Sequence, residues 1–136
     1  MPVQLFTPDG LMQPVPYHHV AVATGTRHVH VAGQIARDAA GRALAPGDLA
    51  GQVAQALRNT GAGLRAAGAD FGDVVRLTFY VTGWSPEKIG AFMDGVEQVA
   101  GELGLPRPLP PSSLIGVDVL FEPDVLVEVE ATAVTA

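Results

Sequence analysis

Four histidines near the N-terminal end are the first side chains that could carry chemistry. His18 and His19 are adjacent, and His28 and His30 follow within a stretch of alternating residues. Residues two apart in a β-strand point to the same side, so His28 and His30 share a face. A zinc site needs three or four ligands in fixed geometry, which this pair does not supply. We therefore predict no metal site and expect the pair to line an interface or a cleft.

Two glutamates near the C-terminal end are the second candidates. Glu128 and Glu130 alternate with apolar residues in the last strand-like segment, so both carboxylates lie on one face. A solvated strand face accounts for such a pair. A carboxylate at an interface can instead act as a general acid or base. The residue pattern alone leaves both interpretations open.

Two further motifs have structural explanations. Residues 61–66 fit the form G-x-G-x-x-A of a dinucleotide-binding loop, but they fall inside a predicted helix instead of between a strand and a helix. Residues 85–88 fit S-x-x-K, but the companion motifs of that enzyme class are missing, and Ser85 before Pro86 is typical of a helix start. Neither motif is predicted to be functional.

The N-terminal half contains the first elements that must position these residues. Alternating small and β-branched residues in 19–24 and 27–33, separated by Gly25 and Thr26, predict a β-hairpin. Asp48 then caps a helix that ends before Gly68. Its glycines, Gly61 and Gly63, indicate close packing on a sheet.

The C-terminal half predicts a central strand, a second helix and two final strands. Residues 74–81 place Val75, Leu77, Phe79 and Val81 on one face. The second helix begins after Ser85, carries Ile89, Phe92, Met93, Val96 and Leu103 on one stripe, and stops at Gly104. Residues 113–120 and 125–134 are predicted to pair with each other, and residues 2–6 to add an edge strand.

This order of elements predicts an α+β fold with one mixed sheet and both helices on one face. Two helices cover only one side of a sheet. The uncovered side would carry polar residues beside small apolar ones, and a monomer would leave it open, so we expect self-association. These polar residues are Arg76, Thr78, Tyr80, Glu128 and Thr132.

Composition excludes several classes of protein. The 136 residues are 48% apolar, which is typical of a folded domain, and we expect one domain over residues 1–136. The net charge is −6 and Lys88 is the only lysine, so a nucleic-acid partner is not expected. There is no cysteine and no apolar run long enough for a membrane span. We expect a cytoplasmic protein with no membrane partner.

Several segments together resemble the RidA/YjgF family of reactive imine and enamine deaminases. The resemblance runs from about Pro14 to Thr132. It rests on Tyr17 after Pro16, V-A-G-Q at 31–34, Y-V-T at 80–82, P-P-S-S-L-I-G-V from Pro110, and L-V-E-V-E-A from Leu126.

The resemblance implies a homotrimer of chorismate-mutase-like subunits with a small-molecule cleft at each subunit interface. It implies that Glu128 is the catalytic acidic residue, that Tyr17 and Gly33 line the pocket, and that Ala32 replaces the family's serine. The family's P-x-R-[ST] motif holds an arginine that clamps the substrate carboxylate. Here Ser112 occupies that position, and Ser113 and Leu114 follow it in the pocket wall.

The function that we expect is hydrolytic deamination, or a related water addition, on an imine, enamine or conjugated small molecule. Such chemistry needs positioned donors and acceptors but no metal or organic cofactor. Without the arginine, small 2-imino acids should be poor substrates, because charge-assisted hydrogen bonds contribute ~1.5–3 kcal/mol each. Arg107 and Arg76 are the candidates to replace it. The alternative is a non-catalytic trimer that binds or senses a small ligand. The ribonuclease activity of some relatives is disfavoured by the negative charge.

Overall fold

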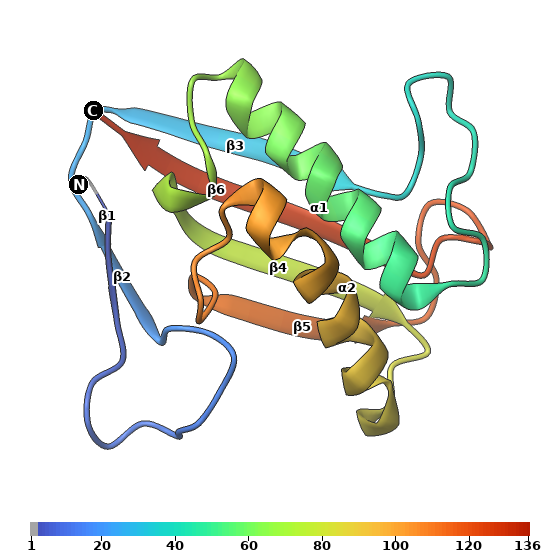
Figure 1. The fold of residues 1–136 in the computed structure, drawn as a ribbon, viewed down its shortest axis with the longest axis horizontal. Coiled ribbons are helices and arrows are strands. Elements are labelled where there is room, and N and C mark those ends of the chain that lie inside the picture. Colours follow the sequence, from blue (N-terminus) through green and yellow to red (C-terminus); the bar gives the residue numbers. More distant parts are fainter. Residues whose placement is uncertain (1–2) are drawn as a thin grey trace.

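The computed structural model describes residues 3–136 of the chain. In Figure 1 the elements follow the order β-β-β-α-β-α-β-β, as predicted. They are β1 Val3–Phe6, β2 Val20–Ala23, β3 Arg27–Gln34, α1 Leu49–Ala66, β4 Val74–Thr82, α2 Ile89–Leu103, β5 Ser112–Val117 and β6 Val127–Thr135, with short 3₁₀ turns at Phe71–Asp73 and Pro86–Lys88.

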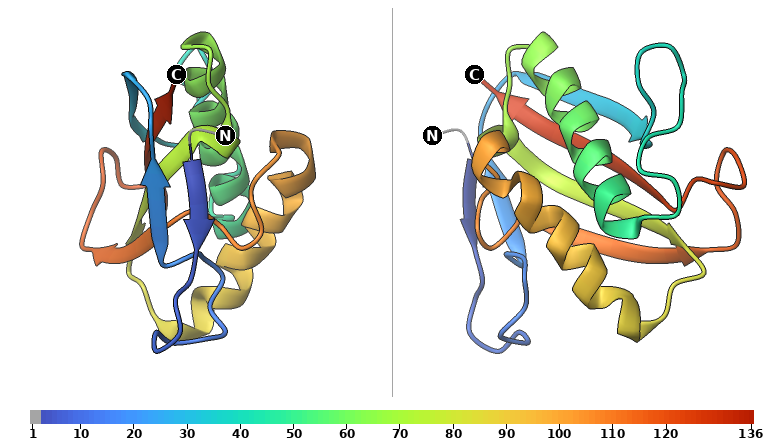
Figure 2. Two further views of the ribbon diagram at one scale, coloured as in Figure 1. Left: turned by 90° about the vertical axis from the view of Figure 1, so that its left-hand side faces the viewer. Right: turned by 45° about the vertical axis from the view of Figure 1, so that its right-hand side comes forward.

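A four-stranded mixed sheet carries both helices on one face. Its strand order is β3-β6-β4-β5, in which β4 and β5 are parallel and the other neighbours antiparallel. Figure 2 shows the sheet with α1 and α2 on the same side. The α+β architecture is therefore confirmed. No helix within the described residues is long and apolar enough to cross a membrane.

The predicted hairpin between β2 and β3 is wrong. β2 pairs with β1 instead, with Val3 opposite Ala23, and forms a separate two-stranded sheet. At Gly25 the chain runs against the end of β6, where an added Cβ would lie 2.3 Å from the carbonyl oxygen of Thr135. The chain therefore moves to a different sheet at this point. The predicted edge strand exists as β1, although Pro2 lies outside the described residues.

The predicted pairing of the last two strands is also wrong. β5 pairs with β4 in parallel, while β6 lies between β3 and β4. The connection from β4 through α2 to β5 is the crossover that parallel neighbours require. The strict alternation in β6 is confirmed, because Val127, Val129, Ala131 and Ala133 are all buried.

Two predicted features of α1 are present in the structure, its N-terminal cap and its close contact with the sheet. Asp48 caps the helix as predicted, accepting a hydrogen bond from the Gly51 nitrogen at 2.9 Å. A Cβ at Gly63 would lie 3.0 Å from the Val31 side chain, which confirms that this glycine marks contact with the sheet. Leu57 and Leu64 on the same helix are fully buried.

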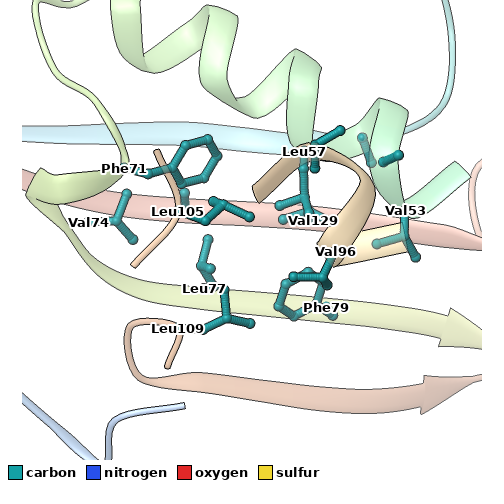
Figure 3. Packing of buried hydrophobic residues seen from close by; sticks show 14 of the residues in the cluster. Val53, Leu57, Phe71, Val74, Leu77, Phe79, Val96, Leu105, Leu109 and Val129 are labelled. Carbon is teal, nitrogen blue, oxygen red and sulfur yellow. The ribbon is translucent and has the colours of Figure 1, made fainter. Parts of the chain in front are cut away.

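The core between the helices and the sheet follows the predicted faces with two shifts (Figure 3). Leu77 and Phe79 are buried as expected. A register shift in β4 opposite β6 places Val74 in the core in place of Val75. Ile89 is 46% exposed, because the turn at Pro86–Lys88 precedes α2 and leaves its first residue at the helix end. Gly104 ends α2 with φ 64°, as predicted.

Candidate functional site

The uncovered face of the four-stranded sheet contains a polar hollow of about 360 Å³. β3, β4 and β6 each contribute side chains from this face. The residues that shape it include His30, Ala32, Arg76, Thr78, Glu130 and Thr132. The predicted polar character of this face is therefore confirmed, and His30 lines a hollow as expected.

Hydrogen bonds order the polar groups beside this hollow. The Tyr80 hydroxyl donates to Glu130 Oε1 at 2.6 Å. This bond raises the pKa of the Tyr80 phenol above its ordinary value, with burial and the charge of Glu130 adding to the effect. Arg76 donates to the Ser113 hydroxyl and so links β4 to β5. The alternation of residues 74–81 predicts Tyr80 on this face but does not reveal its bond to Glu130, because the two residues are diagonal neighbours on different strands.

Glu128 and Gly33 are in direct contact on the same face. An added Cβ at Gly33 would lie 2.3 Å from Glu128 Oε1 and 2.8 Å from its Cγ. The space exists because the register of β3 against β6 shifts between Val31 and Gln34. The Glu128 residue is half-buried. The structure thus brings together two of the predicted site residues, and Ala32 lies next to them in the chain.

The other predicted site residues line a second, mostly apolar hollow of about 270 Å³ beside β5. It lies at the free edge of the sheet, between β5, the start of α2 and the segment before β2. Its walls include Tyr17, Ser112, Ser113, Leu114, Phe79 and Phe92. Backbone hydrogen bonds from Leu109 to Pro16 and from His18 to Leu109, at 2.9 and 2.7 Å, hold the Tyr17 segment against the chain that leads into β5. The Ser112 hydroxyl donates to the Pro110 carbonyl oxygen at 2.7 Å.

Within one chain the Ser112 and Leu114 side chains lie on the opposite face of the sheet from Glu128. Ser112 is opposite Leu77, which is buried under the helices. Glu128 is opposite Tyr80 on the uncovered face. Paired residues of neighbouring strands point to the same side. Ser112 and Glu128 therefore cannot act on one small ligand within a single copy of the chain.

The remaining ionisable candidates have other contacts. Arg107 pairs with Glu97 of α2 at 3.2 Å. His19 Nε2 lies 2.9 Å from the Met12 carbonyl oxygen. Across residues 3–136, no three side chains of histidine, aspartate or glutamate gather in a way that could hold a metal ion.

Known protein families share the sequence pattern and the architecture of this chain. A family model described as endoribonuclease L-PSP matches residues 10–135. The chain belongs to this family. The same assignment confirms the RidA/YjgF resemblance, because structures of Rid and YjgF proteins share the fold.

A Rid family protein of unknown function, YyfB from Yersinia pestis, is 35% identical over 99% of this chain and 100% of its own, with a TM-score of 0.87. The YjgF gene product of E. coli is 27% identical over 97% of this chain and 94% of its own, with a TM-score of 0.68.

Curated relatives of this RidA/YjgF chain are enzymes by name. The 2-iminobutanoate/2-iminopropanoate deaminase of Rattus norvegicus is 46% identical over 52 residues, and that of Bos taurus is 44% identical over the same length. Each match spans 38% of this chain and 38% of the relative. The aligned segment therefore covers less than half of the curated relatives.

Proposed function

We propose that this RidA/YjgF family member is a hydrolytic deaminase of a small imine or enamine, with its active site between subunits of a homotrimer. The observation that carries the proposal is the Glu128 carboxylate, which is half-buried in the notch left by Gly33 on a sheet face that the chain's own helices leave uncovered. The deaminase names of the curated relatives support the same reaction class.

Glu128 would handle the proton and the water in this reaction. As the carboxylate takes a proton from water, the water oxygen bonds to the imine carbon, and the π electrons move to nitrogen, which takes up a proton. The carbinolamine then collapses: its hydroxyl proton passes through the carboxylate to nitrogen, the C–N bond breaks, ammonia leaves and the carbonyl forms. For an enamine, protonation at carbon first gives the iminium. Each step needs only a positioned acid or base, so no metal or organic cofactor is required.

A neighbouring subunit would complete the site. Glu128 and Gly33 lie on the uncovered face, whereas Tyr17, Ser112 and Leu114 line the apolar hollow at the free edge of β5. Packing the uncovered face of one copy against the β5 edge of another would bring the two groups to one cleft, with Ala32 and Ser113 at its border. This arrangement agrees with closed cyclic assembly, the common form for soluble oligomers.

We expect the chain to be a trimer in solution, because burial of the sheet face and completion of the site require a neighbouring subunit, and the family resemblance implies three copies. Light scattering at micromolar concentration should give three times the 14.1 kDa mass of one chain. A mass of one chain at that concentration would contradict both the trimer and an interfacial site.

The function can be tested with imines generated in situ. Amine and amino-acid oxidases, with catalase present, supply a panel of neutral and carboxylated imines, and ammonia and carbonyl product are measured with and without the protein. We expect faster release of both from at least one imine. Unchanged release across the panel would contradict the deaminase proposal.

A second candidate is a trimeric protein that binds a small ligand without turning it over. Two observations favour it: Ser112 occupies the position of the family's carboxylate-binding arginine, and a relative, TdcF of E. coli, has a structure with bound serine. TdcF is 26% identical over 96% of this chain and 94% of its own, with a TM-score of 0.68. Saturable binding of panel products without turnover would favour this candidate.

A further inference from the structure

The apolar hollow beside β5 indicates what this chain's substrate looks like. We propose that it binds the apolar side chain of a substrate without a carboxylate, such as the neutral imine of an aldehyde or ketone bearing a phenyl or branched alkyl group. The proposal rests on the proposed function and adds the substrate class.

The walls of the hollow provide contact for an apolar group and little for an anion. Phe92 and Met93 of α2 contribute to its walls, and Phe79 of β4 does so beside Leu114, its paired neighbour on β5. None of the described side chains that line it carries a charge. Moving an ionised carboxylate from water into such surroundings without a paired cation costs far more than moving a neutral carbonyl or imine.

Ser112 does not replace the missing positive charge. Its hydroxyl hydrogen is donated to the Pro110 carbonyl oxygen at 2.7 Å, so the hydroxyl oxygen is left with acceptor capacity only. A carboxylate is also an acceptor and gains nothing from this group. An N–H of a neutral imine or enamine can donate to it. The residue at the clamp position therefore selects against the anion.

The nearby cations lie outside the hollow. Arg107 pairs with Glu97 on α2. Arg76 lines the polar hollow on the opposite face of the sheet and donates to the Ser113 hydroxyl from that side. Lys88 donates to the Gly83 carbonyl oxygen at 2.7 Å. Neither arginine lines the apolar hollow of its own chain.

The size and mouth of the hollow fit an apolar substituent. A cavity of roughly 150 Å³ with apolar walls holds benzene, and this hollow has about 270 Å³. Two exposed apolar side chains form part of its rim, Met12 at 70% exposure and Ile89 at 46%. Covering them with a ligand or a neighbouring subunit adds to the apolar area removed from water.

Binding of two matched product analogues tests the substrate class directly. Phenylacetone and phenylpyruvate share a benzyl ketone and differ only in a methyl group against a carboxylate. By titration calorimetry, the wild type should bind phenylacetone at least about tenfold more tightly. Ser112→Arg should reverse the preference, while Gln98→Arg, which adds the same charge on the exposed side of α2, should not. Tighter wild-type binding of phenylpyruvate, or no binding of either, would overturn the inference.

Rates of imine hydrolysis distinguish an error in the substrate class from an error in the proposed function. The imine formed by oxidation of phenethylamine should be hydrolysed faster than those formed from phenylalanine and alanine, which carry a carboxylate. Faster hydrolysis of the two imino acids would overturn the substrate class and leave the deaminase function standing. No hydrolysis of any imine, with phenylacetone still preferred in binding, would overturn the deaminase function alone. The wild-type comparison stands even if Ser112→Arg does not fold.

Discussion

Glu128→Gln should reduce imine hydrolysis by about 10²–10⁴-fold, the usual contribution of a positioned general acid or base. The amide keeps the shape of the side chain but cannot take the proton from water. The fold should be unaffected, because Glu128 is half-buried on the uncovered sheet face and packs on Gly33 outside the core. The measurement is kcat/KM on whichever imine the wild type hydrolyses fastest, together with the mass of the oligomer.

Glu130→Gln is the matched control for this change. Glu130 lies on the same face of β6 two residues along, but its carboxylate accepts the Tyr80 hydroxyl hydrogen. We expect Glu130→Gln to lose less than about tenfold, because the amide oxygen of glutamine can still accept the Tyr80 hydroxyl hydrogen. Equal losses of activity in the two variants would indicate that the total negative charge of this sheet face supports hydrolysis, and that Glu128 has no special role. Full activity of Glu128→Gln would show that Glu128 is not the general acid or base.

The sequence predicted those features that depend on residues close together in the chain. The alternation in β6, the cap at Asp48 and the stop at Gly104 are each visible within a few residues, and each is confirmed. Strand pairing is not local. β2 pairs with β1 and not with β3, and Gly25 between β2 and β3 lies against Thr135 at the end of β6, a contact that spans most of the chain.

The site was predictable only through the family resemblance. Nothing in the residue pattern joins Gly33 to Glu128, because their contact depends on a register shift between β3 and β6. Ser112 and Glu128 each belong to a well-defined strand, yet their positions on opposite faces follow from pairing with β4. The sequence predicted that β5 and β6 pair with each other, and that pairing gives no sign of this separation. It is the separation that makes a second subunit necessary.

Gly33→Ala should lower kcat by about 10²-fold with little change in folding stability. The new Cβ would lie 2.3 Å from Glu128 Oε1 and 2.5 Å from its Cδ. The obstructed atoms are the end of a flexible side chain, so the carboxylate swings away and the backbone stays. A displacement of about 1 Å in a catalytic group can cost about 10²-fold in rate. The change should fall on kcat more than on KM, because the displaced carboxylate acts in the chemical step and none of the residues that line the apolar hollow is altered.

Gly101→Ala provides the control for adding a methyl group. Gly101 is exposed on α2, and an added Cβ there meets nothing within 4 Å. Alanine is favoured over glycine in a helix by about 1 kcal/mol, so this variant should keep wild-type activity and melt at the same or a higher temperature.

The decisive comparison combines Gly33→Ala with Glu128→Gln. If the alanine acts by moving the carboxylate, the double variant should be no slower than Glu128→Gln alone, because both changes remove the same group from its position. Losses that multiply would show that Gly33 serves the site through another contact. An unchanged kcat in the single variant Gly33→Ala would show that the Glu128 carboxylate does not act from its position beside Gly33.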